Sequence, residues 1–182
     1  MISVVIATMN RAAALRRFSL ASLLRQTEPN FEVIVWDASA DDDTAGVCES
    51  LIREFEKIGS QLRYFKAPRK GSASQRNDGF TAAEGDIVFY IDDDCELSAD
   101  AISSLCACFR SFPWLNGAGL PMLNKTPSSG NSSLIALATR LFGMKNHLLR
   151  RTINRYGGLS LPIKDLPGPA EWLSGGSMAF RK

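Results

Sequence analysis

Short apolar runs alternate with longer amphipathic or polar segments over the first hundred residues of the chain. The apolar runs are rich in β-branched residues, which is typical of strands that are covered on both faces. Strands are predicted at residues 2–7, 31–36, 62–66 and 87–91, and helices at residues 11–26, 44–58 and 72–83. Repeated strand–helix–strand units with short connections predict an α/β fold with a mostly parallel sheet and helices on its faces.

The pattern is less regular after residue 100. A helix is predicted around Ile102, Leu105 and Phe109, and the longest helix candidate covers residues 132–155, with an apolar stripe and several basic side chains. Short strands are predicted at residues 116–120, 171–173 and 177–181, and the segments between them are rich in Gly, Ser and Pro. We expect a single domain over residues 1–182.

Polar residues mark the start of three predicted helices. Asn10 precedes the first helix and can cap its free amide groups. Ser72 and Gln75 have the spacing of a capping box at the start of the third. The acidic triplet at residues 41–43 precedes the second helix, where the helix dipole favours carboxylates. We therefore interpret this triplet as capping and solvated residues.

The composition is that of a soluble globular protein, with 45% hydrophobic and 22% charged residues among 182. The net charge of +2 gives no reason to expect a nucleic-acid partner. It divides into −6 over residues 1–100 and +8 over residues 101–182, which suggests different partners for the two halves. No apolar run is long enough to span a bilayer, and the N-terminal residues show no secretory signal. We therefore expect a cytoplasmic location.

Three consecutive carboxylates, Asp92, Asp93 and Asp94, follow the predicted strand at residues 87–91. Because successive strand residues point to opposite sides, Asp92 and Asp94 should face the same way. Crowded carboxylates repel one another, and a divalent cation removes that repulsion. Mg²⁺ and Mn²⁺ prefer carboxylate, phosphate and water oxygens. The sequence therefore predicts a magnesium or manganese site at Asp92 and Asp94.

Polar residues also follow two other predicted strands. Thr8, Asn10 and Arg11 follow the first, and Asp37 follows the second. In a sheet of this kind the carboxyl ends of the strands border the ligand crevice, so these residues should meet the acidic triplet at residues 92–94. Hydroxyl, amide and carboxylate groups suit the ribose and base of a nucleotide, and a metal ion suits its diphosphate.

Two common phosphate-binding motifs are absent from the sequence. There is no G-x-x-x-x-G-K-[ST] loop, and no G-x-G-x-x-G follows the first predicted strand. The phosphates would therefore be neutralised mainly by the metal, assisted by basic side chains. The candidates are Arg11, Arg69, Lys70 and Arg76.

Six segments in sequence order resemble the family 2 glycosyltransferases of the GT-A fold. They lie at residues 3–11, 31–39, 71–79, 83–86, 91–94 and 172–181. Each is weak alone, but their order over nearly the whole chain is specific. The resemblance implies a GT-A, Rossmann-like sheet, with residues 1–100 as the nucleotide-binding half and residues 101–182 as the start of the acceptor half.

The resemblance also implies roles for individual residues. In the nucleotide site it places Ala7, Thr8, Met9, Asn10, Arg11, Asp37, Arg76, Asp92 and Asp93. Of these, Ala7, Thr8 and Met9 would line the base pocket, Asp37 would contact the base, and Asp92 and Asp93 would contact ribose and sugar. Asp94 would hold Mn²⁺ or Mg²⁺ together with Asp92. Trp172, Gly175 and Gly176 would border the donor sugar and the acceptor.

The implied activity is transfer of a sugar from a nucleotide-diphosphate donor, with UDP-sugars favoured, to a glycan or lipid-linked acceptor, as in the synthesis of cell-envelope polysaccharide. The reaction would be metal-dependent and inverting, and inversion needs a general base. In the family this base follows the Gly-Gly segment, whereas the only acidic residues after Asp100 are Asp165 and Glu171, which precede it. We assign no base and expect it beyond Lys182, in a longer parent chain.

Two other functions remain open from the sequence. A nucleotide-sugar binding module without catalysis would share the donor motifs and need no base. A sugar nucleotidyltransferase is less consistent with the chain, because residues 7–14 lack the glycine-rich basic loop that such enzymes use.

The basic helix predicted at residues 132–155 suggests a further partner. Its arginines and lysine could approach an anionic membrane surface or a phosphate-linked lipid acceptor. We therefore expect peripheral contact with the inner face of the membrane through this helix.

Overall fold

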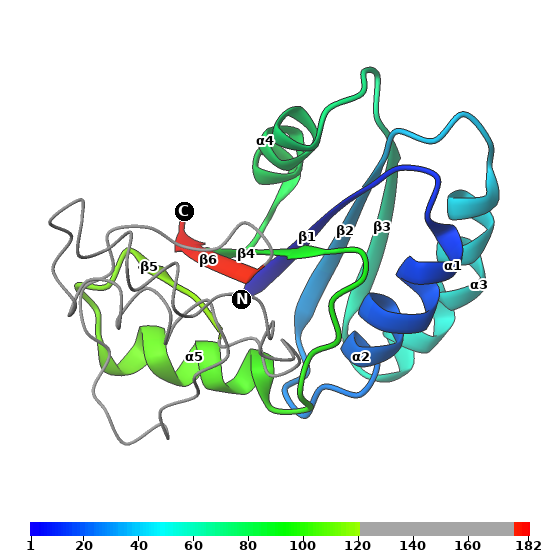
Figure 1. Ribbon diagram of the computed structural model, residues 1–182. Coiled ribbons are helices and arrows are strands. Elements are labelled where there is room, and N and C mark those ends of the chain that lie inside the picture. The colour runs from blue at the N-terminus through cyan, green and yellow to red at the C-terminus, as the bar shows by residue number, and fades with distance from the viewer. Residues whose placement is uncertain (121–176) are drawn as a thin grey trace, which may run out of the picture. The chain divides into compact units, whose positions relative to one another are not determined.

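The computed structural model describes residues 1–120 and 177–182 (Figure 1). The chain divides into two compact units, one formed by Met1–Ala118 with Gly175–Lys182 and the other by Gly119–Ser174. The first unit contains all the helices and strands described below. Within the described residues, no helix combines the length and the apolar character that crossing a membrane requires. The predicted helix at residues 132–155 and the predicted strand at residues 171–173 lie outside the described residues.

Six strands form one sheet in the order β3-β2-β1-β4-β6-β5. They are β1 (Ile2–Thr8), β2 (Phe31–Asp37), β3 (Gln61–Lys66), β4 (Ile87–Asp92), β5 (Gly117–Ala118) and β6 (Ser177–Arg181). The first four are parallel, whereas β6 runs antiparallel to both β4 and β5. The predicted mostly parallel sheet is therefore confirmed, and the strand order reverses between β1 and β4.

Three of the parallel strands extend one residue beyond the predicted apolar runs. These extra residues are Thr8 in β1, Asp37 in β2 and Asp92 in β4. Each is polar and is still paired in the sheet, with Thr8 opposite Asp37 and Asp92 opposite Ala7. The extension matters because it fixes the first polar side chain after each strand to the rigid sheet.

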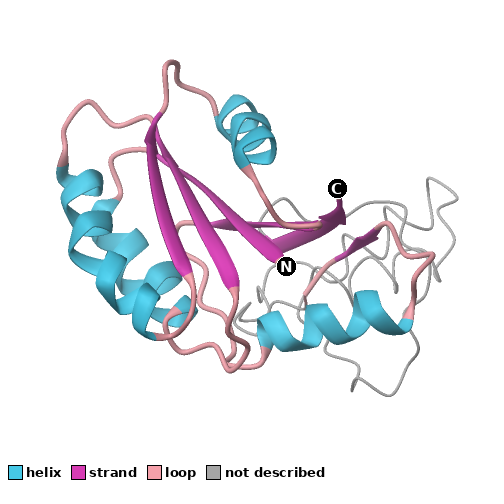
Figure 2. Cartoon of the chain, turned by 180° about the vertical axis from the view of Figure 1, so that it is seen from behind, coloured by secondary structure: helices cyan, strands magenta, loops and turns pink. Residues whose placement is uncertain are grey.

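Helices cover both faces of the sheet. The helical elements are α1 (Ala12–Leu15), η1 (Arg16–Leu20), α2 (Ala21–Leu23), α3 (Asp43–Lys57), α4 (Ser72–Ala82) and α5 (Ala101–Ser111). Figure 1 shows α4 on one side of the sheet and α1, α2 and α3 on the other, and the view from behind agrees (Figure 2). The predicted arrangement of helices on both faces is confirmed.

The two faces of the sheet have separate apolar cores. On the α4 face, Val5 and Ile34 are fully buried in a cluster that also includes Trp36, which stacks on Phe65 with ring centroids 4.9 Å apart. On the opposite face, Phe31 packs edge-on against Phe55 of α3. Alternation of side chains along each strand supplies both cores from one sheet. This explains the continuous apolar runs in the sequence.

The first helical segment differs from the single α-helix predicted at residues 11–26. It begins at Ala12, and η1 is a π-helical turn of five residues between the short helices α1 and α2. Asn10 does not cap it. Its backbone is in the left-handed region, with φ of 57°, and its amide donates to Oγ of Ser39 at 2.7 Å. A π turn holds one more residue than an α turn, so it changes which side chains face the sheet.

A buried carboxylate stabilises the amino ends of the strands. Glu32 in β2 is 1% exposed and accepts hydrogen bonds from Oγ of Ser3 at 2.6 Å, from the amide of Glu84 at 2.6 Å and from Arg63 at 2.8 Å. Burial alone raises the pKa of Glu32, but these three donors outweigh burial and lower it below its ordinary value. The network joins β1, β2, β3 and the segment before β4.

We expect Glu32→Gln to lower the free energy of unfolding at pH 7 by about 2 kcal/mol, because it removes the charged acceptor from a buried network. Since the folded pKa lies below the unfolded one, the stabilisation by Glu32 is complete above about pH 5 and is lost as the pH falls through the folded pKa. The difference between wild type and variant should therefore shrink on acidification. Urea unfolding at several pH values measures it, with the exposed Glu54→Gln as control. A difference independent of pH would contradict this prediction.

Candidate functional site

The last residue of each parallel strand is polar, and together these residues line the carboxyl edge of the sheet. They are Thr8, Asp37, Lys66 and Asp92. The chain continues from β1 to β2 and β3 on one side, whereas β4 lies on the other side of β1. Such a switch point opens a crevice between the two strands that diverge from it. Here the switch point lies between the ends of β1 and β4.

The three carboxylates after β4 do not share one environment. Asp93 is buried, with 6% of its side chain exposed, and it accepts a hydrogen bond from the hydroxyl of Thr8 at 2.7 Å. Asp92 and Asp94 are each more than 40% exposed. Burial raises the pKa of Asp93, partly offset by Thr8 and Arg11. The prediction that Asp92 and Asp94 face the same way is confirmed, because their carboxylate oxygens lie within 4.8 Å of each other.

Two arginines neutralise most of this negative charge. Arg11 places one guanidinium nitrogen 3.2 Å from Asp93 and another 2.7 Å from Asp94. Arg76, from α4, lies 2.6 Å from Asp92. The hydrogen bond to Asp94, together with the charges of Asp93 and Asp94, raises the pKa of Arg11. Three carboxylates and two guanidiniums leave one negative charge in excess.

The π turn η1 holds the acidic segment in place. Ser19 is fully buried, and its hydroxyl donates to the backbone oxygens of Asp92 at 2.8 Å and Cys95 at 3.1 Å. The amide of Cys95 in turn donates to the oxygen of Asp92 at 3.2 Å, which closes a tight turn. Ser19 therefore fixes the backbone on which Asp92 and Asp94 are carried. No pattern in the sequence distinguishes Ser19 from an ordinary helix residue.

The donor atoms at this site fit a hard divalent cation. The carboxylate oxygens of Asp92 and Asp94 and Sγ of Cys95 all lie within 4.8 Å of one another. Burial raises the pKa of the Cys95 thiol, and a hard cation prefers carboxylate oxygens to sulfur. Two carboxylates remain, which is the usual number of protein ligands for Mg²⁺, with phosphate and water oxygens completing the shell.

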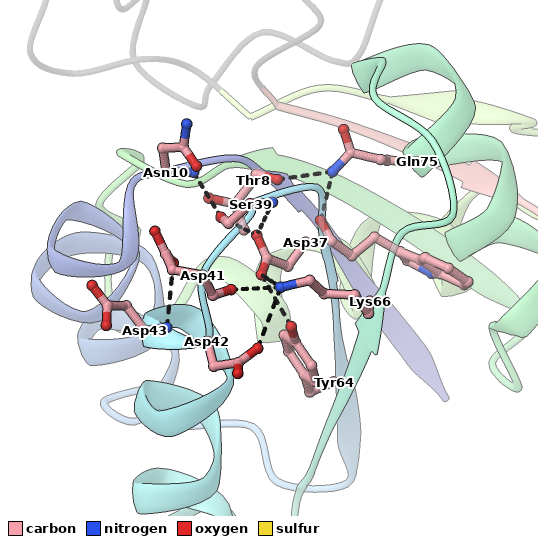
Figure 3. A network of polar contacts seen from close by, with 11 residues as sticks. Thr8, Asn10, Asp37, Ser39, Asp41, Asp42, Asp43, Tyr64, Lys66 and Gln75 are labelled. Atoms are coloured by element: carbon pink, nitrogen blue, oxygen red, sulfur yellow. Dashed lines mark hydrogen bonds and ion pairs between the residues drawn. The ribbon is translucent and has the colours of Figure 1, made fainter.

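Asp37 lies in a second polar network (Figure 3), at the end of β2, which is on the other side of β1 from β4. Its side chain is completely buried and accepts hydrogen bonds from the amide of Ser39 at 2.9 Å, from the hydroxyl of Ser39 and from the hydroxyl of Tyr64 at 3.0 Å. Nζ of Lys66 lies 3.8 Å away. Burial and the hydrogen bond to Asp37 raise the pKa of Tyr64, so its hydroxyl remains a donor. Asp37 is therefore fixed firmly by the protein itself.

Lys66 connects Asp37 to the second acidic triplet. It donates a hydrogen bond to the backbone oxygen of Asp41 and lies 3.6 Å from the carboxylate of Asp42 (Figure 3). Asp42 occupies the position before α3, and Asp43 lies in its first turn, as expected. The Asp42 side chain makes no capping hydrogen bond, but Oδ1 of Asp41 accepts one from the amide of Asp43 at 3.3 Å (Figure 3). The triplet therefore serves as a solvated helix start and also binds Lys66.

The predicted capping box at Ser72 and Gln75 is wrong. Gly71 precedes α4, with φ of 136°, and no side chain caps the helix. Gln75 is buried and donates instead to the backbone oxygens of Thr8 at 2.9 Å and Trp36 at 2.7 Å (Figure 3). These bonds fasten α4 to the ends of β1 and β2. The same helix turn carries Arg76 to Asp92.

The remaining predicted site residues divide into two groups. Ala7, Thr8, Met9 and Asn10 form the end of β1 and the segment after it, and the side chain of Met9 is exposed. Trp172, Gly175 and Gly176 lie outside the described residues, so their predicted contact with sugar and acceptor stays a prediction.

Tyr64 and Lys66 were not among the predicted site residues. Both belong to β3, where Lys66 pairs with Asp37 in register. The signal that could have identified Lys66 is its position, because it is the last residue of a predicted parallel strand and so reaches the same edge as Asp37.

The fold and this edge define a class of protein. They describe an α/β domain with a topological switch point, of the kind that binds nucleotides at the carboxyl ends of its strands. The sequence matches the model of glycosyl transferase family 2 over residues 3–111, which is more than half of the chain. The chain belongs to glycosyl transferase family 2.

Individual relatives agree with this assignment. The chain is 31% identical over 106 residues to the GalNAc(5)-diNAcBac-PP-undecaprenol beta-1,3-glucosyltransferase of Campylobacter jejuni, a match that covers 57% of this chain and 33% of that protein. The chain thus spans about a third of this relative's length.

Solved structures show the same fold. S. aureus TarS 1-349 in complex with UDP superposes with a TM-score of 0.56 and 23% identity, over 67% of this chain and 38% of that one. The mannosyltransferase PcManGT from Pyrobaculum calidifontis, in complex with GDP-Man and Mn²⁺, superposes with a TM-score of 0.61 and 18% identity, over 99% of this chain and 44% of that one. The GT-A fold expected from the sequence is confirmed.

Proposed function

We propose that this chain forms the donor-binding part of a metal-dependent glycosyltransferase that uses a nucleotide-diphosphate sugar, with a UDP-sugar favoured. The observation that carries the proposal is the pair Asp92 and Asp94 at the end of β4, with carboxylate oxygens within 4.8 Å of each other beside Arg11 and Arg76. Carboxylates that can share a cation next to guanidiniums suit a diphosphate ligand. The position at the switch point suits a nucleotide.

The two polar networks suggest a division of the donor between them. In this proposal the base and ribose lie over the ends of β1 and β2, against the exposed Met9, and the diphosphate lies over Asp92 and Asp94. Thr8 and Asp37 are buried and shape the floor of the base and ribose site. Asp93 was expected to contact the donor, but its burial and its hydrogen bond to Thr8 favour a different role. It positions the acidic segment against β1 and does not reach the ligand.

Asp92 and Asp94 would hold Mn²⁺ or Mg²⁺. When bound, the metal would act as a Lewis acid on the departing nucleoside diphosphate. The protein groups contribute orientation and charge: Ser19 fixes the backbone of the acidic segment, and Arg11 and Arg76 offer planar guanidiniums that suit phosphate oxygens. We assign no general base, and inversion at the transferred sugar remains part of the proposal through the family resemblance alone.

The acceptor in this proposal is a glycan or a lipid-linked glycan. The name of the C. jejuni relative, which specifies an undecaprenol-linked substrate, supports the lipid-linked class. Peripheral contact with the inner face of the membrane, through the basic segment at residues 132–155, would bring the chain close to such an acceptor.

Calorimetric titration of the chain with UDP and with GDP, each with and without Mn²⁺, tests the donor site. We expect UDP to bind at least about tenfold more tightly in the presence of Mn²⁺, and GDP to bind less tightly than UDP. UDP binding of equal strength with and without metal would remove the proposed role of Asp92 and Asp94. Absence of nucleotide binding under all four conditions would refute the proposed function.

A further inference from the structure

Arg11 forms an ion pair with Asp94, one of the two carboxylates that would bind the proposed metal. One of its guanidinium nitrogens lies 2.7 Å from Oδ2 of Asp94. On the other side of the same site, a nitrogen of Arg76 lies 2.6 Å from Oδ1 of Asp92. Both carboxylates proposed to hold the cation are therefore paired with a positive charge.

The charge balance makes the site a poor receptor for a metal ion alone. Asp92, Asp93 and Asp94 carry three negative charges, and Arg11 and Arg76 carry two positive ones. A divalent ion at Asp92 and Asp94 would lie within a few ångströms of the Arg11 guanidinium, so repulsion between like charges would weaken its binding. The side chain of Arg11 is 49% exposed, which leaves room for it to turn away.

A nucleoside diphosphate reverses this balance. A metal-bound diphosphate is negative overall, and its phosphate oxygens accept the same planar, forked hydrogen bonds that Arg11 now gives to Asp93 and Asp94. Arg11 could then exchange a carboxylate for a phosphate without losing a charged partner. Repulsion between Arg11 and the incoming metal is thereby replaced by attraction between Arg11 and the diphosphate.

We propose that Arg11 makes the binding of metal and nucleotide interdependent. Its guanidinium stays paired with Asp94 until a diphosphate binds, and it then leaves Asp94 and pairs with the phosphate oxygens. The inference rests on the proposed function, because it assumes a diphosphate donor at this edge. It assigns Arg11 as a positioning residue whose contacts change during binding. By linkage, the metal strengthens nucleotide binding by the same factor by which the nucleotide strengthens metal binding.

A merely structural ion pair would behave differently. Exposed pairs contribute little to stability, so loss of such a pair would change neither unfolding nor metal affinity appreciably. The pair between Arg25 and Glu96, at 2.8 Å and with about half of each side chain exposed, is a matched example a few residues from the acidic segment. Arg25→Gln removes one positive charge from the same region but touches none of Asp92, Asp93 and Asp94, so it serves as the control.

The test is a titration of the full chain with Mn²⁺, followed through the electron paramagnetic resonance signal of free Mn²⁺, with and without saturating UDP. We expect Arg11→Gln to bind Mn²⁺ alone about tenfold more tightly than wild type, because one repelling charge is gone. We expect UDP to strengthen Mn²⁺ binding at least about tenfold in wild type and no more than about threefold in Arg11→Gln. Arg25→Gln should match wild type, and Arg11→Lys, which keeps the charge, should bind Mn²⁺ alone as weakly as wild type.

The outcomes separate this inference from the proposed function. If Arg11→Gln binds Mn²⁺ alone no more tightly than wild type, the exchange is wrong, even where UDP binding still depends on metal. If Arg25→Gln tightens Mn²⁺ binding as much as Arg11→Gln, the effect comes from the net charge of the region. The proposed change of partner by Arg11, from Asp94 to the diphosphate, is then also wrong. If wild type binds no UDP at all, the proposed function fails, and the metal-only titrations still report whether Arg11 competes with the cation.

Discussion

Asp94→Ala will lower the affinity for UDP in the presence of Mn²⁺ by at least about tenfold, to that of UDP without metal. The variant removes one of the two carboxylates that can share a cation, and a single carboxylate holds a divalent ion weakly in water. Asp94 is 47% exposed, so the variant should fold normally. The measurement is calorimetric titration with UDP at fixed Mn²⁺, beside thermal unfolding to verify that the fold is intact.

The second acidic triplet provides the control for this experiment. Asp43→Ala removes an exposed carboxylate from the first turn of α3, outside the acidic segment after β4, and should leave UDP affinity within about twofold of wild type. If both variants lose affinity equally, the loss reflects overall charge and not a metal site. If Asp94→Ala retains Mn²⁺-dependent binding, Asp94 is not the metal ligand.

Gly79→Ala will destabilise the protein by about 3 kcal/mol. A Cβ atom at Gly79 would clash with Cγ1 of Val5 and would lie 3.1 Å from Cδ1 of Trp36. Val5 is fully buried in the central strand, and Trp36 is stacked on Phe65, so neither can withdraw without disturbing the core. Gly79 is therefore required for the close approach of α4 to the sheet. Urea unfolding at pH 7 measures the loss.

A second helical glycine gives a control for which the opposite change in stability is expected. Gly46 lies in α3, is exposed, and has no heavy atom within 4 Å of the position that a Cβ would take. Gly46→Ala should therefore stabilise the chain by about 0.5–1 kcal/mol through helix propensity and the entropy of the unfolded state. Equal effects of the two substitutions would show that packing of α4 does not depend on Gly79.

Because α4 also carries Gln75 and Arg76, Gly79→Ala should affect both stability and nucleotide binding. Gln75 fastens the helix to the ends of β1 and β2, and Arg76 reaches Asp92. A helix displaced by a larger residue at position 79 would move both side chains. Loss of stability and loss of nucleotide binding are therefore expected together in that variant.

The strands of this fold could be predicted from the sequence because burial on both faces produces continuous apolar runs. Val5 and Ile34 face one core, and Phe31 faces the other. Apart from Ser3 and Glu32, which pair with each other in the buried network, these strands are apolar until Thr8 and Asp37. Strand β5 is shorter than predicted, with only Gly117–Ala118 paired.

The local geometry of two helices could not be predicted from the same patterns. The spacing of apolar residues at positions 11–26 is compatible with a regular helix, whereas the π turn at Arg16–Leu20 carries Ser19, which contacts a segment more than seventy residues away. Likewise, the capping-box spacing at Ser72 and Gln75 is a local signal. It was overridden because Gln75 satisfies backbone oxygens of two strands, which are distant in sequence.

The sequence predicted which sheet edge carries the candidate site, but not which charged side chains pair with one another there. The strand ends identify Thr8, Asp37 and Asp92, since the carboxyl ends of parallel strands must meet. Which arginine pairs with which carboxylate depends on side-chain conformations and on the position of α4, and neither has a sequence signal. The burial of Asp93 depends in the same way on Thr8, which is 85 positions earlier.

The antiparallel strand β6 has a consequence for the order of folding. It pairs with β4 through residues 177–181, and these come after the whole segment of residues 93–176. Until β6 has been synthesised, β4 presents an unpaired edge in the middle of the future sheet, although its partner β1 is already complete. Open edges of this kind favour association with other chains, and closing such a long loop is slow. During synthesis, this edge of β4 is therefore the part of the sheet most exposed to misassembly.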